Sequence, residues 1–221
     1  MSSEGPDSHF IVLPGGGYAA YADNEGQPIV DWLGSLGISA SVLRYPLNAP
    51  HPLPLNAVRS EVRRLRAAGI KRVGAIGFSA GGHLAGHAAL SDASQPETRI
   101  DLAVLGYAIT SMETETYRPA RLILLGDDAS PELRRATSLD ALVSPAAPPF
   151  FIWHTAEDPH VPVEHSYRFA AALAAQDVPH AVHVFSKGPH SLGLARGAGE
   201  AAAWPNLAAA WLTERRITII R

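Results

Sequence analysis

Cysteine is absent from the 221 residues of this sequence, which excludes disulfide bonds, thiolate metal sites and a cysteine nucleophile. Long hydrophobic runs are absent too: no stretch approaches the ~18 apolar residues that a membrane-spanning helix needs. Residues 1–9 have neither a basic start nor an apolar core, so they do not resemble a secretory signal. From these absences we expect a cytoplasmic protein with no membrane partner.

Charged residues are few, at 18% of the chain, and the formal net charge is −3. A chain without a basic excess has little electrostatic attraction for nucleic acid, so no nucleic-acid partner is expected. Hydrophobic residues make up 47% of the sequence, a share typical of a globular protein with one sizeable core. We therefore expect a single domain that spans residues 1–221.

Short apolar runs recur along the chain and predict the strands of a sheet. They lie at residues 10–13, 38–43, 73–78, 102–108, 150–153 and 181–185. Their near-continuous hydrophobicity indicates strands that are buried on both faces of a parallel sheet. Helical patterns lie between them, as in residues 55–65, where apolar residues recur every three or four positions. This alternation predicts an α/β fold with a doubly wound, mostly parallel six-stranded sheet and helices on both faces.

Residues 110–147 interrupt this alternation and form a candidate insertion. A short helix is expected at residues 117–125, followed by acidic and proline-rich turns. The insertion follows the fourth predicted strand, so it should overhang the strand ends, where α/β sheets bind ligands. Two interpretations are left open: a small lid over the site, or a packing excursion with no role in binding.

A glycine-rich turn supplies the candidate nucleophile. Residues 77–81 read Gly-Phe-Ser-Ala-Gly, directly after an apolar run and before a pattern of small helical residues. This strand–turn–helix context is the one that a nucleophile elbow needs. Glycines two residues before and two after Ser79 keep side chains from colliding with the neighbouring strand and helix. Ser79 is therefore predicted to stand at the carboxyl end of a strand as a nucleophile.

Acyl transfer by a serine also needs amide donors for the developing oxyanion. Residues 13–18 read Leu-Pro-Gly-Gly-Gly-Tyr after the first predicted strand, and such glycines let the backbone approach a substrate. A phosphate loop is disfavoured because no lysine follows at the required spacing and Ala20 breaks the G-x-G-x-x-G pattern. We predict that the amides of Ala80 and of Gly16 or Gly17 form an oxyanion hole, with a plain glycine turn as the alternative.

His190 is the candidate general base among ten histidines. It closes a Gly-Pro-His sequence after the predicted strand 181–185, so it lies on a loop at the carboxyl end of the sheet. A histidine on such a loop can reach the hydroxyl of Ser79 and take its proton. Most of the other histidines fall in a turn, a strand or the helix after the elbow, where packing accounts for them: His51, His180, His183, His83 and His87.

The acid that orients the base is expected after the fifth predicted strand. Glu157 and Asp158 stand there side by side. Asp158 is favoured because it precedes Pro159, which biases its backbone toward an extended or turn conformation, and Glu157 is the runner-up.

Metal hydrolysis is disfavoured: His160 and His165 are five residues apart, and no H-E-x-x-H motif occurs. No metal site and no cofactor are expected.

Five segments carry a resemblance to a known family: 14–18 (PGGGY), 43–46 (LRYP), 77–84 (GFSAGGHL), 154–162 (HTAEDPHVP) and 187–194 (KGPHSLGL). In this order the chain resembles the small esterases of the α/β-hydrolase superfamily that are grouped with acetyl xylan and feruloyl esterases, including xylanase-like esterases. The resemblance implies a serine esterase that works through an acyl-serine intermediate on short-chain carboxylic esters, with acetyl esters of carbohydrates favoured. The chain order of Ser79, Asp158 and His190 is that of α/β-hydrolases.

Two features depart from the family pattern. Ser191 stands where a glycine usually follows the histidine. The glycine-rich loop follows the first predicted strand here, whereas it follows the third in a full α/β-hydrolase. The resemblance therefore implies a sheet that lacks the two leading strands, with strand order 2-1-3-4-5-6 in this chain's own numbering.

The sequence leaves alternatives for the substrate and for the oligomeric state. Tyr18, beside the oxyanion glycines, is a candidate to stack on a sugar ring, and packing under the insertion is the alternative of equal weight. An insertion that mixes charged with apolar residues suits a polar alcohol better than a lipid surface.

A small-molecule ester is the expected partner, and a homodimer is left open. The alternatives to an esterase are an amidase, peptidase or formamidase with the same triad, or a non-catalytic binding protein with a hydrolase fold.

Overall fold

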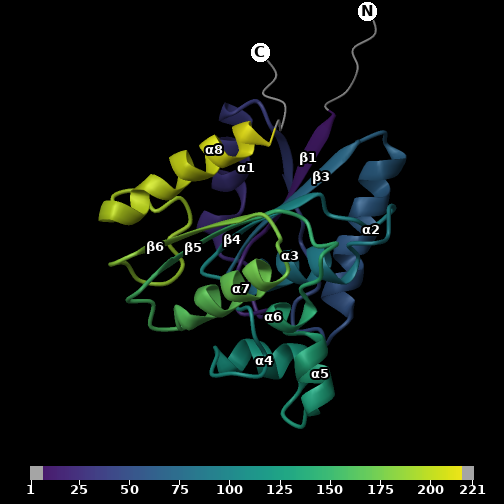
Figure 1. The fold of residues 1–221 in the computed structure, drawn as a ribbon, viewed down its shortest axis with the longest axis vertical. Coiled ribbons are helices and arrows are strands. Elements are labelled where there is room, and N and C mark those ends of the chain that lie inside the picture. Colours follow the sequence, from purple (N-terminus) through teal and green to yellow (C-terminus); the bar gives the residue numbers. More distant parts are fainter. Residues whose placement is uncertain (1–6, 216–221) are drawn as a thin grey trace, which may run out of the picture.

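A six-stranded sheet forms the centre of the computed structural model, which describes residues 7–215 (Figure 1). Every neighbouring pair of strands is parallel, and the spatial order is β2-β1-β3-β4-β5-β6. The strands are β1 (Ser8–Leu13), β2 (Ser39–Val42), β3 (Arg72–Phe78), β4 (Leu102–Gly106), β5 (Phe150–Thr155) and β6 (His180–Phe185). The strand order expected from the sequence is confirmed.

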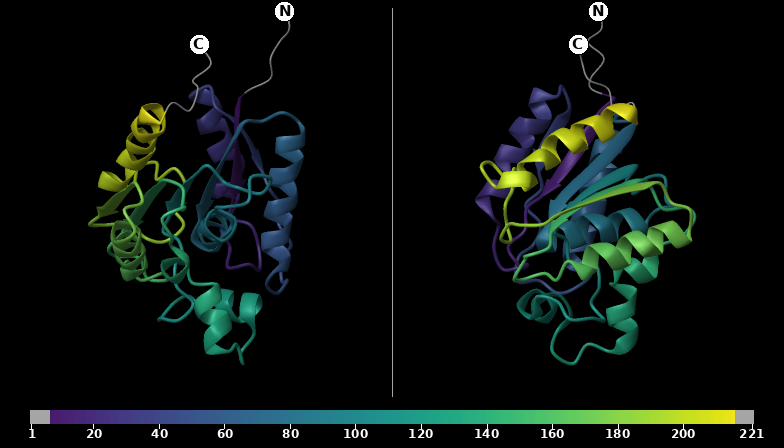
Figure 2. Two further views of the ribbon diagram at one scale, coloured as in Figure 1. Left: turned by 45° about the vertical axis from the view of Figure 1, so that its right-hand side comes forward. Right: turned by 60° about the vertical axis from the view of Figure 1, so that its left-hand side comes forward.

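Helices cover both faces of this sheet. They are α1 (Gln27–Ser35), α2 (Leu53–Ala67), α3 (Ser79–Ser91), α4 (Arg118–Leu125), α5 (Pro131–Ala136), α6 (Leu139–Leu142), α7 (Glu164–Ala175) and α8 (Trp204–Glu214), with short 3-10 helices η1 (Asp23–Glu25) and η2 (Gly199–Ala203). Helices α1 and α8 pack on one face, and α2, α3 and α7 pack on the other (Figure 2). No helix within residues 7–215 combines the length and apolar character needed to cross a membrane.

The central strands account for the continuous apolar runs in the sequence. Every residue of β4 and β5 is buried, whereas the edge strands β2 and β6 are only partly covered. On the face of α1 and α8, Trp153 of β5 stacks on Trp204 of α8 with ring centroids 4.9 Å apart. Each such large apolar side chain contributes roughly 2–3 kcal/mol by leaving water. The rigid sheet that results holds the loops at its carboxyl edge in place.

The insertion at residues 110–147 contains α4, α5 and α6 and projects at the bottom of Figure 1. It is anchored to the body of the fold by buried hydrogen bonds. Nε2 of His83 in α3 donates to the carbonyl of Thr137 at 2.7 Å, and the amide of Thr110 donates to Nδ1 of His165 in α7 at 2.9 Å. The role of the insertion as a lid stays a prediction.

Candidate active site

Ser79 stands on a strained turn between β3 and α3. Its φ is +52°, a left-handed value that a side chain disfavours, and the residue is 6% exposed. The flanking glycines make this turn possible. A Cβ on Gly77 would lie 2.2 Å from the carbonyl oxygen of Gly81, and one on Gly81 would lie 2.1 Å from that of Leu13. Both contacts are far below any tolerable distance, which explains the glycines of the elbow.

The structure brings Ser79, His190 and Asp158 together in a hydrogen-bonded chain. Oγ of Ser79 lies 2.9 Å from Nε2 of His190, and Nδ1 of the same ring lies 2.6 Å from Oδ2 of Asp158. A carboxylate only accepts, so Nδ1 carries the ring proton and donates it to Asp158. Nε2 is then free to accept the proton of the serine hydroxyl. This tautomer is the one that a general base needs.

Asp158 is held by three further contacts on the turn after β5. The amides of His160 and Val161 donate to Oδ1 at 2.8 and 3.0 Å, and Nε2 of His154 approaches Oδ2 at 3.2 Å. Burial alone would raise the pKa of Asp158, but the hydrogen bonds from His154, His190 and Val161 outweigh it and leave the pKa well below its usual value. Its neighbour Glu157 is exposed and takes no part.

His154 is a residue to which the sequence analysis assigns no role. It is fully buried at the end of β5. Its Nε2 donates to the carbonyl of Val161 at 3.0 Å as well as facing Asp158, and its Nδ1 lies 2.8 Å from Oγ of Ser166. The ring therefore braces the turn that carries the acid. Its position four residues before Asp158 is the only sequence signal that could have indicated this.

The glycine loop after β1 presents free amides at the site. Gly16 and Gly17 adopt φ values of +119° and +64°. Among residues 7–215 no acceptor takes either of their amides, whereas the amide of Gly15 is bound to a side chain. Ala80 lies in the first turn of α3, where a backbone amide has no acceptor within the helix. Gly16 and Gly17 line the cavity that contains Ser79. The oxyanion hole formed by these amides and that of Ala80 stays a prediction.

A cavity of about 310 Å³ opens in front of Ser79. Its walls are Gly16, Gly17, Ala22, Ser79, Tyr117, His160, His190 and Ser191. Tyr117 comes from the insertion, and its ring meets that of His160 edge-on at 5.7 Å. His160 in turn meets the ring of His190 at 5.5 Å. The sequence analysis assigns neither Tyr117 nor His160 to the site, because the two segments approach each other only in the folded chain.

Tyr18 does not reach this cavity. Its ring is completely buried, and its hydroxyl donates to Nδ1 of His83 at 2.6 Å. His83 also bonds the insertion through Thr137. Tyr18 therefore packs under the insertion, and no face of its ring is exposed to stack on a sugar.

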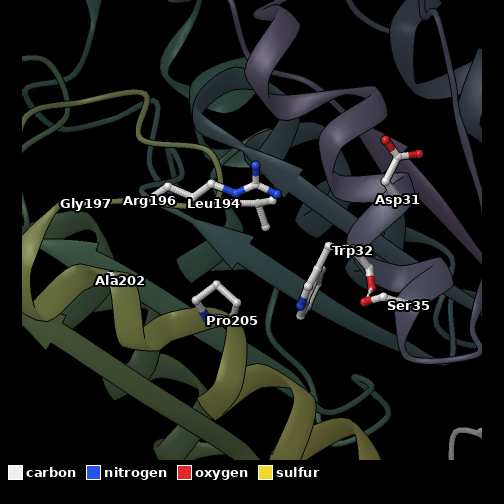
Figure 3. Close-up of a pocket in the computed structure, with 8 residues that line it drawn as sticks. All are labelled: Asp31, Trp32, Ser35, Leu194, Arg196, Gly197, Ala202 and Pro205. Carbon is white, nitrogen blue, oxygen red and sulfur yellow. Dashed lines mark hydrogen bonds between the residues drawn. The ribbon is translucent and has the colours of Figure 1, made fainter.

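A second hollow, of about 470 Å³, lies between α1 and the segment around η2 (Figure 3). Trp32 and Pro205 form part of its walls, and Arg196 lies across it. The polar side chains that α1 contributes are bonded within that helix: Asp31 accepts from Gln27, and Ser35 donates to the carbonyl of Trp32. The hollow shares no lining residue with the cavity at Ser79. It therefore holds none of the triad residues.

Metal-ligating side chains do not gather in the described part of the chain. Residues 7–215 contain no group of three or more histidines, aspartates or glutamates placed to hold a metal ion. Of the two histidines that the sequence spaces five apart, His160 is exposed at the cavity, while His165 is buried in α7. The ring of His165 bonds the amide of Thr110 and the carbonyl of Glu115. His165 thus secures the start of the insertion.

A serine on an elbow, followed in the chain by an acid and then a histidine at the carboxyl edge of a parallel sheet, defines the class of α/β-hydrolases. Comparison with family models agrees with this class. The model of the prolyl oligopeptidase family matches residues 55–215, and the chain belongs to this family.

Two curated proteins and one solved structure show the similarity of this chain to known proteins. The chain is 34% identical over 205 residues to endo-1,4-beta-xylanase B of Butyrivibrio fibrisolvens, and 30% identical over 206 residues to an acetylxylan esterase of Xylanibacter ruminicola. These matches cover 84% and 86% of this chain but only 32% and 42% of the two curated relatives. Among solved structures, the acetyl ester-xyloside bifunctional hydrolase of Caldicellulosiruptor lactoaceticus matches with a TM-score of 0.90 and 34% identity, covering 98% of this chain and 86% of that one.

Proposed function

We propose that this protein is a serine esterase that hydrolyses short-chain carboxylic esters, with acetyl esters of carbohydrates as its substrate class. The observation that carries the proposal is the hydrogen-bonded chain from Ser79 through His190 to Asp158 at the wall of a cavity. The names of two relatives, an acetylxylan esterase and an acetyl ester-xyloside hydrolase, support the substrate class.

Acylation begins when Oγ of Ser79 attacks the ester carbonyl carbon while its proton passes to Nε2 of His190. The tetrahedral intermediate places its negative oxygen toward the free amides of the glycine loop and Ala80. Asp158 stabilises the imidazolium that has formed. The intermediate then collapses: Nε2 returns the proton to the leaving alcohol, and the acyl group stays on Ser79.

Deacylation repeats these steps with water. His190 takes a proton from the water molecule as its oxygen attacks the acyl-serine carbonyl. The second tetrahedral intermediate uses the same amides. When it collapses, the proton passes from Nε2 to Oγ of Ser79, and the carboxylic acid leaves. The serine hydroxyl is restored, and one ester has been split into one alcohol and one acid.

The cavity favours a small acyl group. Its volume of about 310 Å³ lies at the lower end of the range for small-molecule sites. The rings of Tyr117 and His160 narrow it, and both carry polar atoms that can bond a hydroxylated alcohol. Among the lining residues only Ala22 has an aliphatic side chain, which offers little apolar surface to a fatty chain. A short acyl group on a polar alcohol therefore fits this site best.

The test is a panel of p-nitrophenyl esters from acetyl to octanoyl, together with acetylated xylose, each measured with Ser79→Ala as the control. We expect kcat/KM to fall steeply as the acyl chain lengthens, and acetate to be released from the sugar. Preference for octanoyl or longer chains would contradict the short-acyl assignment and favour a lipase.

Amide hydrolysis by the same triad is the second candidate, because the matching family model is that of a peptidase family. The p-nitroanilide of acetate provides a matched substrate with the same acyl group. A kcat/KM for this anilide within about tenfold of the acetyl ester would favour an amidase. We expect a much larger preference for the ester.

A further inference from the structure

A buried carboxylate lies behind the site and is not a member of the triad. Glu25, at the end of η1, is 0% exposed, and its oxygens receive three hydrogen bonds. The amide of Gly15 donates to Oε2 at 2.7 Å, and the hydroxyls of Tyr107 and Ser191 donate to Oε1 at 2.8 and 2.6 Å. A charged group in such a place is costly unless hydrogen bonds satisfy it.

The direction of each bond follows from its partners. The amide of Gly15 can only donate. The hydroxyl oxygen of Tyr107 already accepts from the amide of Gly193 at 2.9 Å, so its proton is available to Glu25. Glu25 therefore accepts all three bonds, an arrangement that suits an ionised carboxylate without a proton. Its three partners are uncharged, so the negative charge is not cancelled by an ion pair with them.

These partners belong to three different parts of the site. Gly15 begins the loop whose amides face the cavity, and a Cβ there would lie 3.0 Å from Cβ of Ser79. Tyr107 follows β4, and its ring meets that of His190 edge-on at 4.9 Å. Ser191 is the residue after His190 and has a φ of +62°. One side chain thus connects the oxyanion loop, the ring that packs against the base, and the loop that carries the base.

We propose that Glu25 is a positioning residue: its buried carboxylate holds the oxyanion loop and the His190 loop at their working distances from Ser79. The inference rests on the proposed esterase function and deepens it. A misplacement of about 1 Å in such groups costs on the order of 10²-fold in rate, so the carboxylate affects turnover through the loops that it holds in place.

The variant Glu25→Gln tests this proposal. A carboxamide has one accepting oxygen and one donating nitrogen, so either Gly15 or the two hydroxyls must face a donor. We expect kcat for the acetyl ester to fall about 10- to 100-fold with KM changed less than twofold.

The matched control is Glu157→Gln, which makes the same chemical change at an exposed carboxylate beside the acid of the triad. Its kcat should stay within twofold of the wild type. A role for Glu25 in stability alone would lower the melting temperature of Glu25→Gln but leave kcat per folded molecule unchanged. That result would overturn the proposal.

Two milder variants decide the matter if Glu25→Gln does not fold. Ser191→Gly removes one hydroxyl donor and suits the positive φ at that position, and Tyr107→Phe removes the other. Each should lower kcat about 3- to 10-fold with KM changed less than twofold, because one of the bonds that place these loops is lost. A folded double variant that keeps kcat within twofold would overturn the proposal.

The wild-type protein separates failure of this inference from failure of the proposed function. If the wild type does not hydrolyse the acetyl ester, the esterase assignment is wrong. If the wild type is active and Glu25→Gln matches it in kcat, only the role of Glu25 is wrong.

Discussion

At the level of single residues, the first prediction concerns Ser79. Its backbone is strained, and its Oγ lies 2.9 Å from Nε2 of His190. Ser79→Ala removes the attacking oxygen but leaves the helix that follows intact. We expect kcat for the acetyl ester to fall by roughly 10⁴ to 10⁶, because the whole covalent route is lost. The melting temperature should change little, which circular dichroism checks. A variant that retains more than about a tenth of the wild-type rate would show that Ser79 is not the nucleophile.

The choice between two adjacent carboxylates leads to a second prediction. Asp158→Asn puts a donor opposite Nδ1 of His190, which favours the wrong tautomer, and should lower kcat by ~10⁴. Glu157→Gln alters only an exposed group and should leave kcat within twofold. Steady-state kinetics of the two variants side by side decide between the carboxylates. The reverse pattern would mean that the acid has been misplaced by one residue.

Residues of this site differ in how well the sequence predicts them. The elbow, the loop histidine and the acid before a proline are recognisable because each lies in a local motif at a strand end. Glu25 is not recognisable, since its partners Tyr107 and Ser191 are 82 and 166 positions away along the chain. A glutamate in a polar stretch has no local pattern that distinguishes a buried acceptor from a solvated side chain.

Between elements, the contact of α3 with the insertion leads to a prediction about pH. Burial of His83 lowers its pKa to about 4, and its neutral ring bonds both Tyr18 and Thr137. Between pH 6.5 and 4 the unfolded chain binds a proton at His83 that the folded chain does not. The contribution of His83 to the free energy of unfolding should therefore be fully present above pH 6.5. It should be lost as the pH falls toward 4, by roughly 3 kcal/mol.

Urea unfolding at pH 7.5 and pH 4.5 measures this effect. The variant His83→Gln lacks the titrating ring and should show a smaller difference in unfolding free energy between the two pH values. His160→Gln, at an exposed histidine, is the control and should keep the wild-type difference. Equal wild-type stability at both pH values would contradict the account. The lowered pKa of Asp158 acts in the same direction but only at more acidic pH, as that carboxylate becomes protonated.

Strands of this fold were easier to predict than the short helices of the insertion. The run at residues 102–108 contains β4 (Leu102–Gly106), and 38–43 contains β2 (Ser39–Val42), with differences only at the ends. The expected helix at 117–125 matches α4 (Arg118–Leu125). Helices α5 and α6 have six and four residues, too few for an apolar period to be read.

At the scale of the whole molecule, the order of the strands in the sheet determines which residues meet at the site. The glycine loop, the elbow, the acid and the base follow β1, β3, β5 and β6, so residues from 15 to 191 meet at one edge of the sheet. A parallel sheet brings all its carboxyl ends to that edge, which is why the sequence order of strands could predict the meeting. The exact distances depend on the packed core beneath and could not be predicted from the chain.

The central claim is that the folded chain activates Ser79 through His190. A fluorophosphonate probe reacts with an activated serine and leaves a mass label on it, so peptide mapping after labelling tests the claim most directly. We predict a label on Ser79 in nearly every wild-type molecule, and labelling slowed at least about 10³-fold in His190→Ala. An unlabelled wild type, a label on a different residue, or an equal labelling rate in His190→Ala would contradict the account.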